Sequence, residues 1–285
     1  MDRITPNTKL TCLLGHPVSH SASPAIHNAS YHAAGVDAVY LAFDVRDLER
    51  AVSGLQELGA VGCNITIPHK EEALRLATTL SEEVRLIGAI NTLKFGEGGV
   101  EGYNTDVNGV LRSLELLDIK GVGEALLLGA GGAARAVVVA LRDRVSKLVI
   151  TSRSLWRAEG LATMASELGF ESLAVPWERR NYFVERAELV VNATPVGTYG
   201  EGMPVDASRL QKGCAVFDLV YNPPDTPLVK AARRAGCRAL GGLPMLVRQA
   251  AESERIWFNI DPPEEVMMRA AKRFLGVENE GDGEG

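Results

Sequence analysis

A glycine-rich turn between an apolar run and a helical stretch constrains this chain more than any other feature. Residues 125–128 (Ala-Leu-Leu-Leu) lead into Gly-Ala-Gly-Gly-Ala-Ala-Arg at 129–135, and an apolar stretch follows. This order predicts a buried parallel strand, a tight turn and the start of a helix. The spacing Gly129-x-Gly131-x-x-Ala134 also matches the dinucleotide-binding fingerprint, with Ala in the third place.

Each small residue of the turn has a physical role in this interpretation. Gly129 permits the sharp turn, Gly131 lets the backbone approach a pyrophosphate, and Ala134 lets the helix pack closely on the strand. The first N–H groups of the helix would bind the anion. The alternative is a glycine-rich turn that binds nothing, but the flanking strand and helix favour a dinucleotide site. The residues expected to contact the cofactor here are Gly129, Ala130, Gly131, Gly132 and Ala133.

The end of the next predicted strand, residues 147–151, indicates which nicotinamide cofactor to expect. An NAD site usually has Asp or Glu there, and the carboxylate binds the ribose 2′-hydroxyl. This chain instead has Ser152, Arg153 and Ser154, followed by Arg157. Two guanidiniums suit a 2′-phosphate, to which the serines can also donate hydrogen bonds. The sequence therefore predicts NADP; the alternative is that the arginines only begin a solvated helix.

Length and charge limit what kind of protein this is. A chain of 285 residues can form one large or two ordinary domains. Its net charge of −6 gives no electrostatic basis for a nucleic-acid or anionic-membrane partner. No stretch approaches the ~18 apolar residues of a membrane span, and the N-terminus lacks an apolar signal core. We therefore expect a cytoplasmic protein.

The cysteines and histidines do not form a metal-binding pattern. The four cysteines are far apart and include no Cys-x-x-Cys pair, which is typical of buried thiols in a reducing compartment. All five histidines precede residue 71, but His16 and His20 flank Pro17 on a predicted loop, and no acid or cysteine accompanies these two at ligand spacing. We therefore expect no metal site.

Strands alternate with helices through most of the chain. This alternation predicts an α/β protein whose mostly parallel sheets are covered on both faces. In the first part we expect Ser23 to cap a helix with Pro24 at its first position, and a further helix over about 69–78 after Pro68. A helix over 105–117 is expected to link this part to a second, Rossmann-type part.

Polar side chains stand beside apolar runs at several predicted strand ends. Asn64 and Thr66 alternate along one strand and so share a face. Lys70 is expected in the first turn of a helix, where it opposes the macrodipole and needs another role. The alternative, that such residues only form turns and caps, explains Lys70 poorly. Together they suit a small polyhydroxylated ligand with a carboxylate. The full set is Ser21, Ser23, Asn64, Thr66, Lys70, Asn91, Thr105 and Asp106.

Seven short segments carry distinctive patterns along nearly the whole chain. They are residues 21–24 (Ser-Ala-Ser-Pro), 64–70 (Asn-Ile-Thr-Ile-Pro-His-Lys), 88–92 (Gly-Ala-Ile-Asn-Thr), 104–106 (Asn-Thr-Asp), 129–135, 192–195 (Asn-Ala-Thr-Pro) and 242–249 (Gly-Leu-Pro-Met-Leu-Val-Arg-Gln). In this order they resemble the shikimate dehydrogenase family. The resemblance implies reversible reduction of 3-dehydroshikimate to shikimate by NADPH. It also implies two domains: a discontinuous substrate domain over 1–103 and 242–285, and a Rossmann domain over 104–241.

The resemblance also implies roles for individual residues. Ser21 and Ser23 would hold the substrate carboxylate, which Tyr221 would approach. The residues that would bind the ring hydroxyls are Asn64, Thr66, Asn91, Asp106 and Gln249. Lys70 would bind the substrate and form the catalytic pair with Asp106, because charge that grows on the ketone oxygen needs a proton donor. The remaining cofactor residues are Ser152, Arg153, Ser154, Arg157, Asn192, Ala193, Thr194, Leu219, Gly242 and Met245.

Two positions depart from the family pattern, and several alternatives stay open. His69 stands where many relatives have an aromatic residue, and Pro244 replaces a glycine near the expected nicotinamide site. A quinate/shikimate dehydrogenase that tolerates NAD is one alternative, against which the two arginines argue. Another is a relative acting on an amino-substituted ring acid. A third is an NADP-sensing module without catalysis, which would not need the acid–base pair. The sequence does not decide between a monomer and a homodimer.

Overall fold

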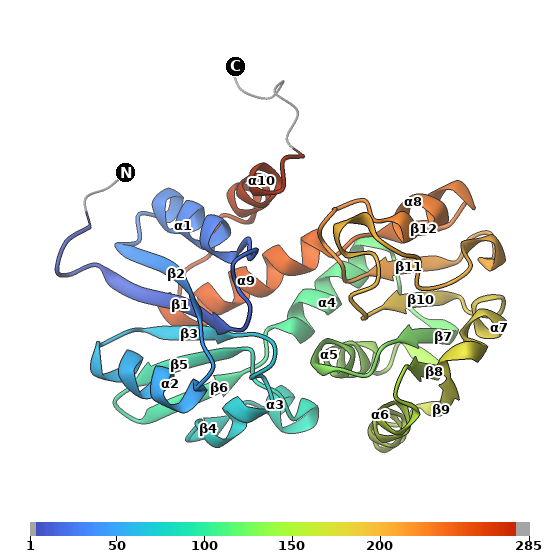
Figure 1. Ribbon diagram of the computed structural model, residues 1–285, viewed down its shortest axis with the longest axis horizontal. Helices are drawn as coiled ribbons and strands as arrows, with labels where there is room; N and C mark the ends of the chain where they lie inside the picture. Colours follow the sequence, from blue (N-terminus) through green and yellow to red (C-terminus); the bar gives the residue numbers. More distant parts are fainter. Residues whose placement is uncertain (1–3, 278–285) are drawn as a thin grey trace. The chain divides into compact units, whose positions relative to one another are not determined.

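Two separate six-stranded sheets organise the chain in the computed structural model, which describes residues 4–277 (Figure 1). One unit comprises the described parts of Met1–Thr105 and Val247–Gly285, and the other is Asp106–Leu246. Residues 278–285 of the predicted segment 242–285 lie outside the described residues. No helix in the described range is long and apolar enough to cross a membrane.

The sheet of the first unit has the strand order β2-β1-β3-β5-β6-β4. Strand β5 runs antiparallel to both neighbours, and the other pairings are parallel. A short turn that contains Gly98 joins β5 to β6. The strands are β1 (Lys9–Gly15), β2 (Ala38–Asp44), β3 (Gly62–Ile65), β4 (Thr79–Leu80), β5 (Thr92–Gly96) and β6 (Gly99–Tyr103).

Helices pack on both faces of this sheet (Figure 1). On one face, Leu48 and Val52 of α2 join apolar residues of β1 and β3. On the other, Tyr31 of α1 and Trp257 of α9 pack with Tyr40 of β2. The helices are α1 (Ser23–Ala34), α2 (Leu48–Glu57), α3 (Glu82–Ile87), α9 (Leu243–Phe258), whose first residues belong to the second unit, and α10 (Glu264–Phe274).

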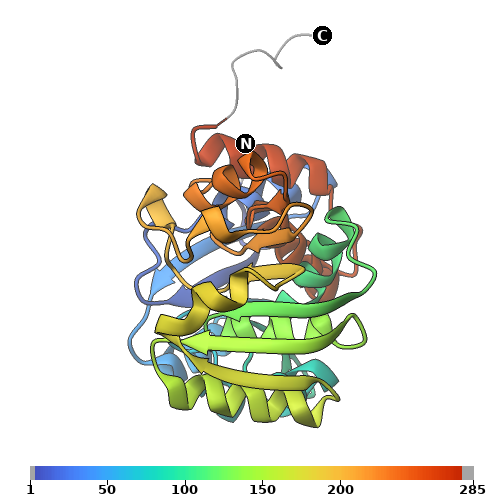
Figure 2. The same cartoon turned by 90° about the vertical axis from the view of Figure 1, so that its right-hand side faces the viewer.

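The second unit has an all-parallel sheet in the order β12-β11-β10-β7-β8-β9 (Figure 2). Residues 125–128 of its central strand are fully buried, as expected for a parallel strand covered on both faces. The strands are β7 (Val122–Leu128), β8 (Val145–Ser152), β9 (Glu171–Pro176), β10 (Leu189–Asn192), β11 (Ala215–Asp218) and β12 (Arg238–Leu240). The helices are α4 (Asp106–Leu116), α5 (Gly132–Leu141), α6 (Leu155–Glu167), α7 (Arg180–Val184) and α8 (Pro227–Arg234).

The predicted helix over 69–78 is wrong. The segment forms a turn, one 3₁₀ turn at Glu72–Arg75 and then strand β4. The buried ring of His69 bonds to the carbonyl oxygen of Val45 at 2.8 Å, and the N–H of Thr78 donates to the carbonyl oxygen of Val100 at 2.7 Å. The segment is therefore tied at one end to Val45, just after β2, and at the other end to Val100 of β6, and it does not continue as one helix. The macrodipole argument for Lys70 therefore does not apply.

The predicted helix cap at Ser23 is also wrong. Helix α1 begins at Ser23 itself, and Ala22 occupies the N-cap position without a side-chain cap. The Oγ of Ser21 accepts a hydrogen bond from the Ser23 N–H at 3.2 Å, so the preceding serine meets this backbone donor. The side chain of Ser23 is thus not used as a cap.

Candidate active site

The glycine turn after β7 has a backbone shape that few other residues could adopt. Gly129 has a φ of +109°, and a Cβ there would lie 2.8 Å from the carbonyl oxygen of Ala193. Helix α5 begins at Gly132 with Gly131 as its N-cap, and a Cβ on Gly131 would meet no atom within 4 Å. Bare backbone and the N-terminus of a helix therefore border open space, which fits a pyrophosphate.

Two arginines follow the carboxyl end of β8, Arg153 directly after the strand and Arg157 in the first turn of α6. Arg153 and Arg157 are exposed, and neither forms an ion pair within residues 4–277. The Arg157 guanidinium lies 5.2 Å from the centre of the Trp156 ring. The Oγ of Ser152 accepts from the Ser154 N–H at 3.1 Å, which shapes the turn between β8 and α6. Two guanidiniums without counter-ions fit a 2′-phosphate.

Asn192 ends β10, but its side chain is fully buried. Its Nδ2 donates to Asp218 Oδ1 at 2.8 Å, and its Oδ1 accepts from the Thr194 N–H at 3.1 Å. Asp218 also accepts from Thr226 Oγ1 at 2.6 Å, and burial raises the pKa of its carboxyl. Asn192 therefore shapes the turn that carries Ala193 and Thr194 and does not offer its amide to a ligand.

Leu219 and Gly242 lie side by side just beyond the end of β11. The N–H of Gly242 donates to the carbonyl oxygen of Val220 at 2.9 Å, and a Cβ on Gly242 would lie 2.1 Å from the carbonyl oxygen of Leu219. Only glycine fits this approach. Met245 is buried in the first turn of α9. Pro244 is the second residue of that helix, where a backbone N–H has no partner within the helix in any case.

In the first unit, buried amides and hydroxyls join three of the predicted substrate residues. Asn64 Nδ2 donates to Thr92 Oγ1 at 3.0 Å, and Thr92 Oγ1 donates to Asn91 Oδ1 at 2.9 Å. The Thr105 N–H donates to the same Asn91 oxygen at 2.8 Å, and Thr105 Oγ1 donates to Gln249 Oε1 at 3.4 Å. Asn64, Asn91 and Gln249 therefore belong to one network, which β3, the start of β5 and α9 build together.

The other predicted substrate residues of this unit are Ser21, Ser23, Thr66 and Lys70. Ser21 Oγ donates to Ser23 Oγ at 3.2 Å, so the structure brings the two serines together. Lys70 is half-buried, and its carbonyl oxygen accepts from the Ile90 N–H at 2.8 Å. The turn that carries Lys70 is therefore tied to the residue immediately before Asn91.

Asp106 and Tyr221 belong to the second unit. Asp106 is the buried first residue of α4 and directly follows Thr105 in the chain. Burial and the neighbouring Tyr199 raise the pKa of Tyr221, so its phenol is protonated at neutral pH. The pairing of Lys70 with Asp106 stays a prediction.

Sequence patterns did not identify four buried polar residues near the network. Tyr40 donates to Asn64 Oδ1 at 2.7 Å, and Ser253 Oγ accepts from Asn64 Nδ2 at 3.0 Å. His27 and Glu254 pair at 2.7 Å. In the sequence these residues look like parts of an ordinary strand and of ordinary helices.

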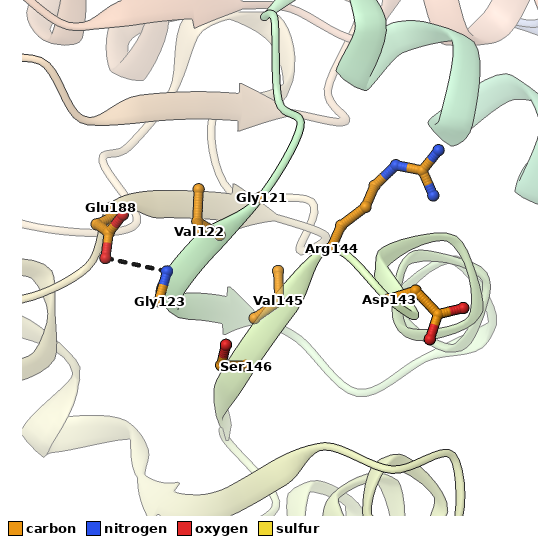
Figure 3. A pocket seen from close by; sticks show the side chains of 8 residues that line it. All are labelled: Gly121, Val122, Gly123, Asp143, Arg144, Val145, Ser146 and Glu188. Atoms are coloured by element: carbon orange, nitrogen blue, oxygen red, sulfur yellow. Dashed lines mark hydrogen bonds between the residues drawn. The ribbon is translucent and has the colours of Figure 1, made fainter.

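A hollow of about 470 Å³ lies at the amino ends of β7 and β8 (Figure 3). Its lining includes Arg144, Asp143 and Glu188, and the Gly123 N–H donates to Glu188 Oε1 at 3.0 Å. The glycine turn and the two arginines follow the carboxyl ends of the same strands. The hollow therefore does not coincide with the predicted cofactor site, because parallel sheets bind dinucleotides at their carboxyl edge.

A Rossmann-type unit with this turn, combined with an α/β unit that carries a buried polar network, defines a two-domain dinucleotide-dependent oxidoreductase. Family models agree with that class. The model described as "Shikimate dehydrogenase substrate binding domain" matches residues 13–93, and "Shikimate 5′-dehydrogenase C-terminal domain" matches residues 242–272.

Individual relatives match over nearly the full chain. Shikimate dehydrogenase (NADP(+)) of Methanothermobacter thermautotrophicus is 43% identical, with 95% of this chain and 99% of that protein covered. Among solved structures, shikimate 5-dehydrogenase from Thermus thermophilus, in complex with NADP(H) and shikimate, has a TM-score of 0.84 at 36% identity, covering 94% of this chain and 100% of that one. Quinate dehydrogenase from Corynebacterium glutamicum, in complex with NAD, has a TM-score of 0.87 at 33% identity, covering 92% and 98%. The chain belongs to the shikimate dehydrogenase family.

Proposed function

We propose that this protein is an NADP-dependent shikimate dehydrogenase, which reversibly reduces 3-dehydroshikimate to shikimate. The observation that carries the cofactor choice is the pair Arg153 and Arg157, which have no ion-pair partner within residues 4–277, at the end of β8. A carboxylate at this position would repel a 2′-phosphate, whereas two guanidiniums attract it. The relative from M. thermautotrophicus carries NADP(+) in its name, which supports the same choice.

The chain's own residues supply substrate binding and proton transfer in this proposal. NADPH, when bound, supplies the hydride that the ketone carbon accepts. Lys70 gives a proton to the ketone oxygen as the C=O bond becomes C–O, and Asp106 orients the ammonium group. In the oxidative direction Lys70 takes the same proton back. Ser21 and Ser23 bind the carboxylate, while Asn64, Asn91 and Gln249 bind ring hydroxyls.

The state of the four cysteines supports a location of the protein in the reducing cytoplasm. All four are free and buried, which is typical of cytosolic proteins, where thiols stay reduced. The net charge of −6 gives no electrostatic basis for a nucleic-acid partner.

An assay with four substrate pairs tests the proposed function. Purified protein receives shikimate or quinate, each with NADP⁺ or NAD⁺, and reduced nicotinamide is followed by its absorbance. We expect shikimate with NADP⁺ to give the highest kcat/KM. Quinate with NAD⁺ as the best pair would favour the alternative that the likeness to the C. glutamicum enzyme raises. Absence of turnover with every pair, together with NADPH binding, would favour the sensing module.

A further inference from the structure

The amide of Asn64 is held from both sides by buried groups. Tyr40 Oη donates to Asn64 Oδ1 at 2.7 Å. On the other side, Nδ2 lies 3.0 Å from both Thr92 Oγ1 and Ser253 Oγ, and 3.2 Å from the carbonyl oxygen of Asn91. Asn64 itself is 6% exposed, so water cannot replace most of these partners. The orientation of the amide is therefore determined by protein groups.

The direction of each hydrogen bond follows from the neighbours. A carbonyl oxygen can only accept, so the nitrogen of the Asn64 amide must face Asn91. Thr92 Oγ1 donates its proton to Asn91 Oδ1 at 2.9 Å, so toward Asn64 it acts as an acceptor. Both protons of Asn64 Nδ2 are thus donated to protein groups. The second lone pair of Asn64 Oδ1 remains to accept a hydrogen bond from a ligand.

Tyr40 can maintain this orientation of the Asn64 amide, but it is too deeply buried to contact a ligand. Its side chain is completely buried, and its ring stacks on His27 with centroids 4.1 Å apart and planes 12° apart. Burial raises the pKa of the phenol well above its usual range, so the hydroxyl remains a donor at neutral pH. Without that donor, Oδ1 would be left partly unsatisfied in a buried site, and the amide would lose one of its restraints.

We propose that Tyr40 is a positioning residue, whose hydroxyl holds Asn64 as a hydrogen-bond acceptor for one hydroxyl of the substrate ring. This inference rests on the proposed function, because it assigns Asn64 to shikimate. The Tyr40 hydroxyl interacts with Ser23 as well as with Asn64, and the Asn64→Ala background separates these two routes. Loss of this hydroxyl should therefore weaken substrate binding more than it slows the chemical step.

The variant Tyr40→Phe removes only the hydroxyl, and Tyr31→Phe is a matched control. Tyr31 belongs to the same buried cluster and donates or accepts one hydrogen bond, with Thr11 at 2.8 Å, away from Asn64. For Y40F we expect KM for shikimate to rise about tenfold, kcat to change less than about threefold, and the Kd for NADPH to stay unchanged. For Y31F we expect wild-type KM.

A double-mutant cycle with Asn64→Ala separates positioning from general packing. If Tyr40 acts through Asn64, adding Y40F to N64A should change KM by less than about twofold. The inference would be overturned by wild-type KM in Y40F, by an equal loss in Y31F, by an undiminished effect in the N64A background, or by failure of Y40F alone to fold. Wild-type protein without shikimate turnover would instead reject the proposed function.

Discussion

His27 Nδ1 lies 2.7 Å from Glu254 Oε1, and both side chains are completely buried. Ser30 Oγ donates to the other carboxylate oxygen of Glu254 at 2.5 Å. These two contacts join α1 to α9 inside the first unit, although the helices are more than two hundred residues apart in sequence. The other ring nitrogen of His27 is buried and has no hydrogen-bond partner within residues 4–277. Within residues 4–277, the His27 ring therefore forms its hydrogen bond with Glu254 alone.

Glu254→Ala should destabilise the protein strongly. It leaves the imidazole and the Ser30 hydroxyl buried without their partner, which typically costs about 3–5 kcal/mol. Glu252→Ala is the matched control on the same helix, because Glu252 pairs with Arg255 at 3.4 Å in a partly exposed position. We expect this control to cost no more than about 1 kcal/mol. Urea unfolding measures both values, and equal losses would contradict the importance of the buried pair.

Gly129→Ala and Gly131→Ala should have different effects, although they lie two residues apart. Alanine at 129 is strained by the φ of +109° and would press on the Ala193 carbonyl, so we expect a loss of about 1–3 kcal/mol in unfolding free energy. Alanine at 131 meets no protein atom, so the melting temperature should not change. Its methyl group would occupy the space proposed for the pyrophosphate and weaken NADPH binding about tenfold. Normal NADPH affinity in G131A would contradict that placement.

Arg153→Ala should weaken NADPH binding and leave NADH binding unchanged. Loss of a charge-assisted bond to the 2′-phosphate corresponds to about 1.5–3 kcal/mol, or roughly 10- to 100-fold in Kd. Arg179→Ala is the control, because Arg179 is also exposed in the second unit but lies against the ring of Tyr182. Fluorescence titration with both nucleotides supplies the comparison. An equal loss for NADH would show that Arg153 does not recognise the phosphate.

Lys70→Ala should lower turnover far more than substrate affinity. General acid catalysis typically contributes about 100- to 10,000-fold, so we expect kcat to fall within that range and KM to change only a few-fold. Lys94→Ala on β5 is the control, because Lys94 is also half-buried in the first unit but absent from the predicted site. Steady-state kinetics at saturating NADP⁺ measure the effect. Near-normal kcat in K70A would remove Lys70 from the proposed chemistry.

Local patterns predicted the second unit well because its signals are contiguous. The turn at Gly129 and the missing acid near Arg153 each depend on a few neighbouring residues. The segment after Pro68 was mispredicted because its shape depends on distant strands, such as the bond between Thr78 and Val100.

The buried network of the first unit could not be predicted for the same reason. Asn64 bonds to Tyr40, 24 residues away, and to Ser253, 189 residues away. No local pattern links such positions. The sequence did indicate that Asn64 and Asn91 are polar residues at strand ends, but the groups that orient them become visible only in the folded chain.

Asp218→Asn should change how stability depends on pH. Burial raises the pKa of Asp218 in the folded state, so the folded protein holds this proton more tightly than the unfolded chain does. The stabilising contribution of Asp218 is therefore greatest in acid and is lost as pH rises from about 3.9, the usual value, through the raised folded pKa. Asparagine can still accept from Asn192 and donate to Thr226, so the fold should persist.

The test compares the unfolding free energies of wild type and D218N in urea at pH 4 and pH 7. Because the other acids are common to both proteins, their titration cancels in the difference. We expect wild type minus D218N to be more positive at pH 4 than at pH 7. A difference that is constant with pH would mean that the carboxyl of Asp218 has an ordinary pKa, and that its bonds with Asn192 and Thr226 offset the cost of burying its charge.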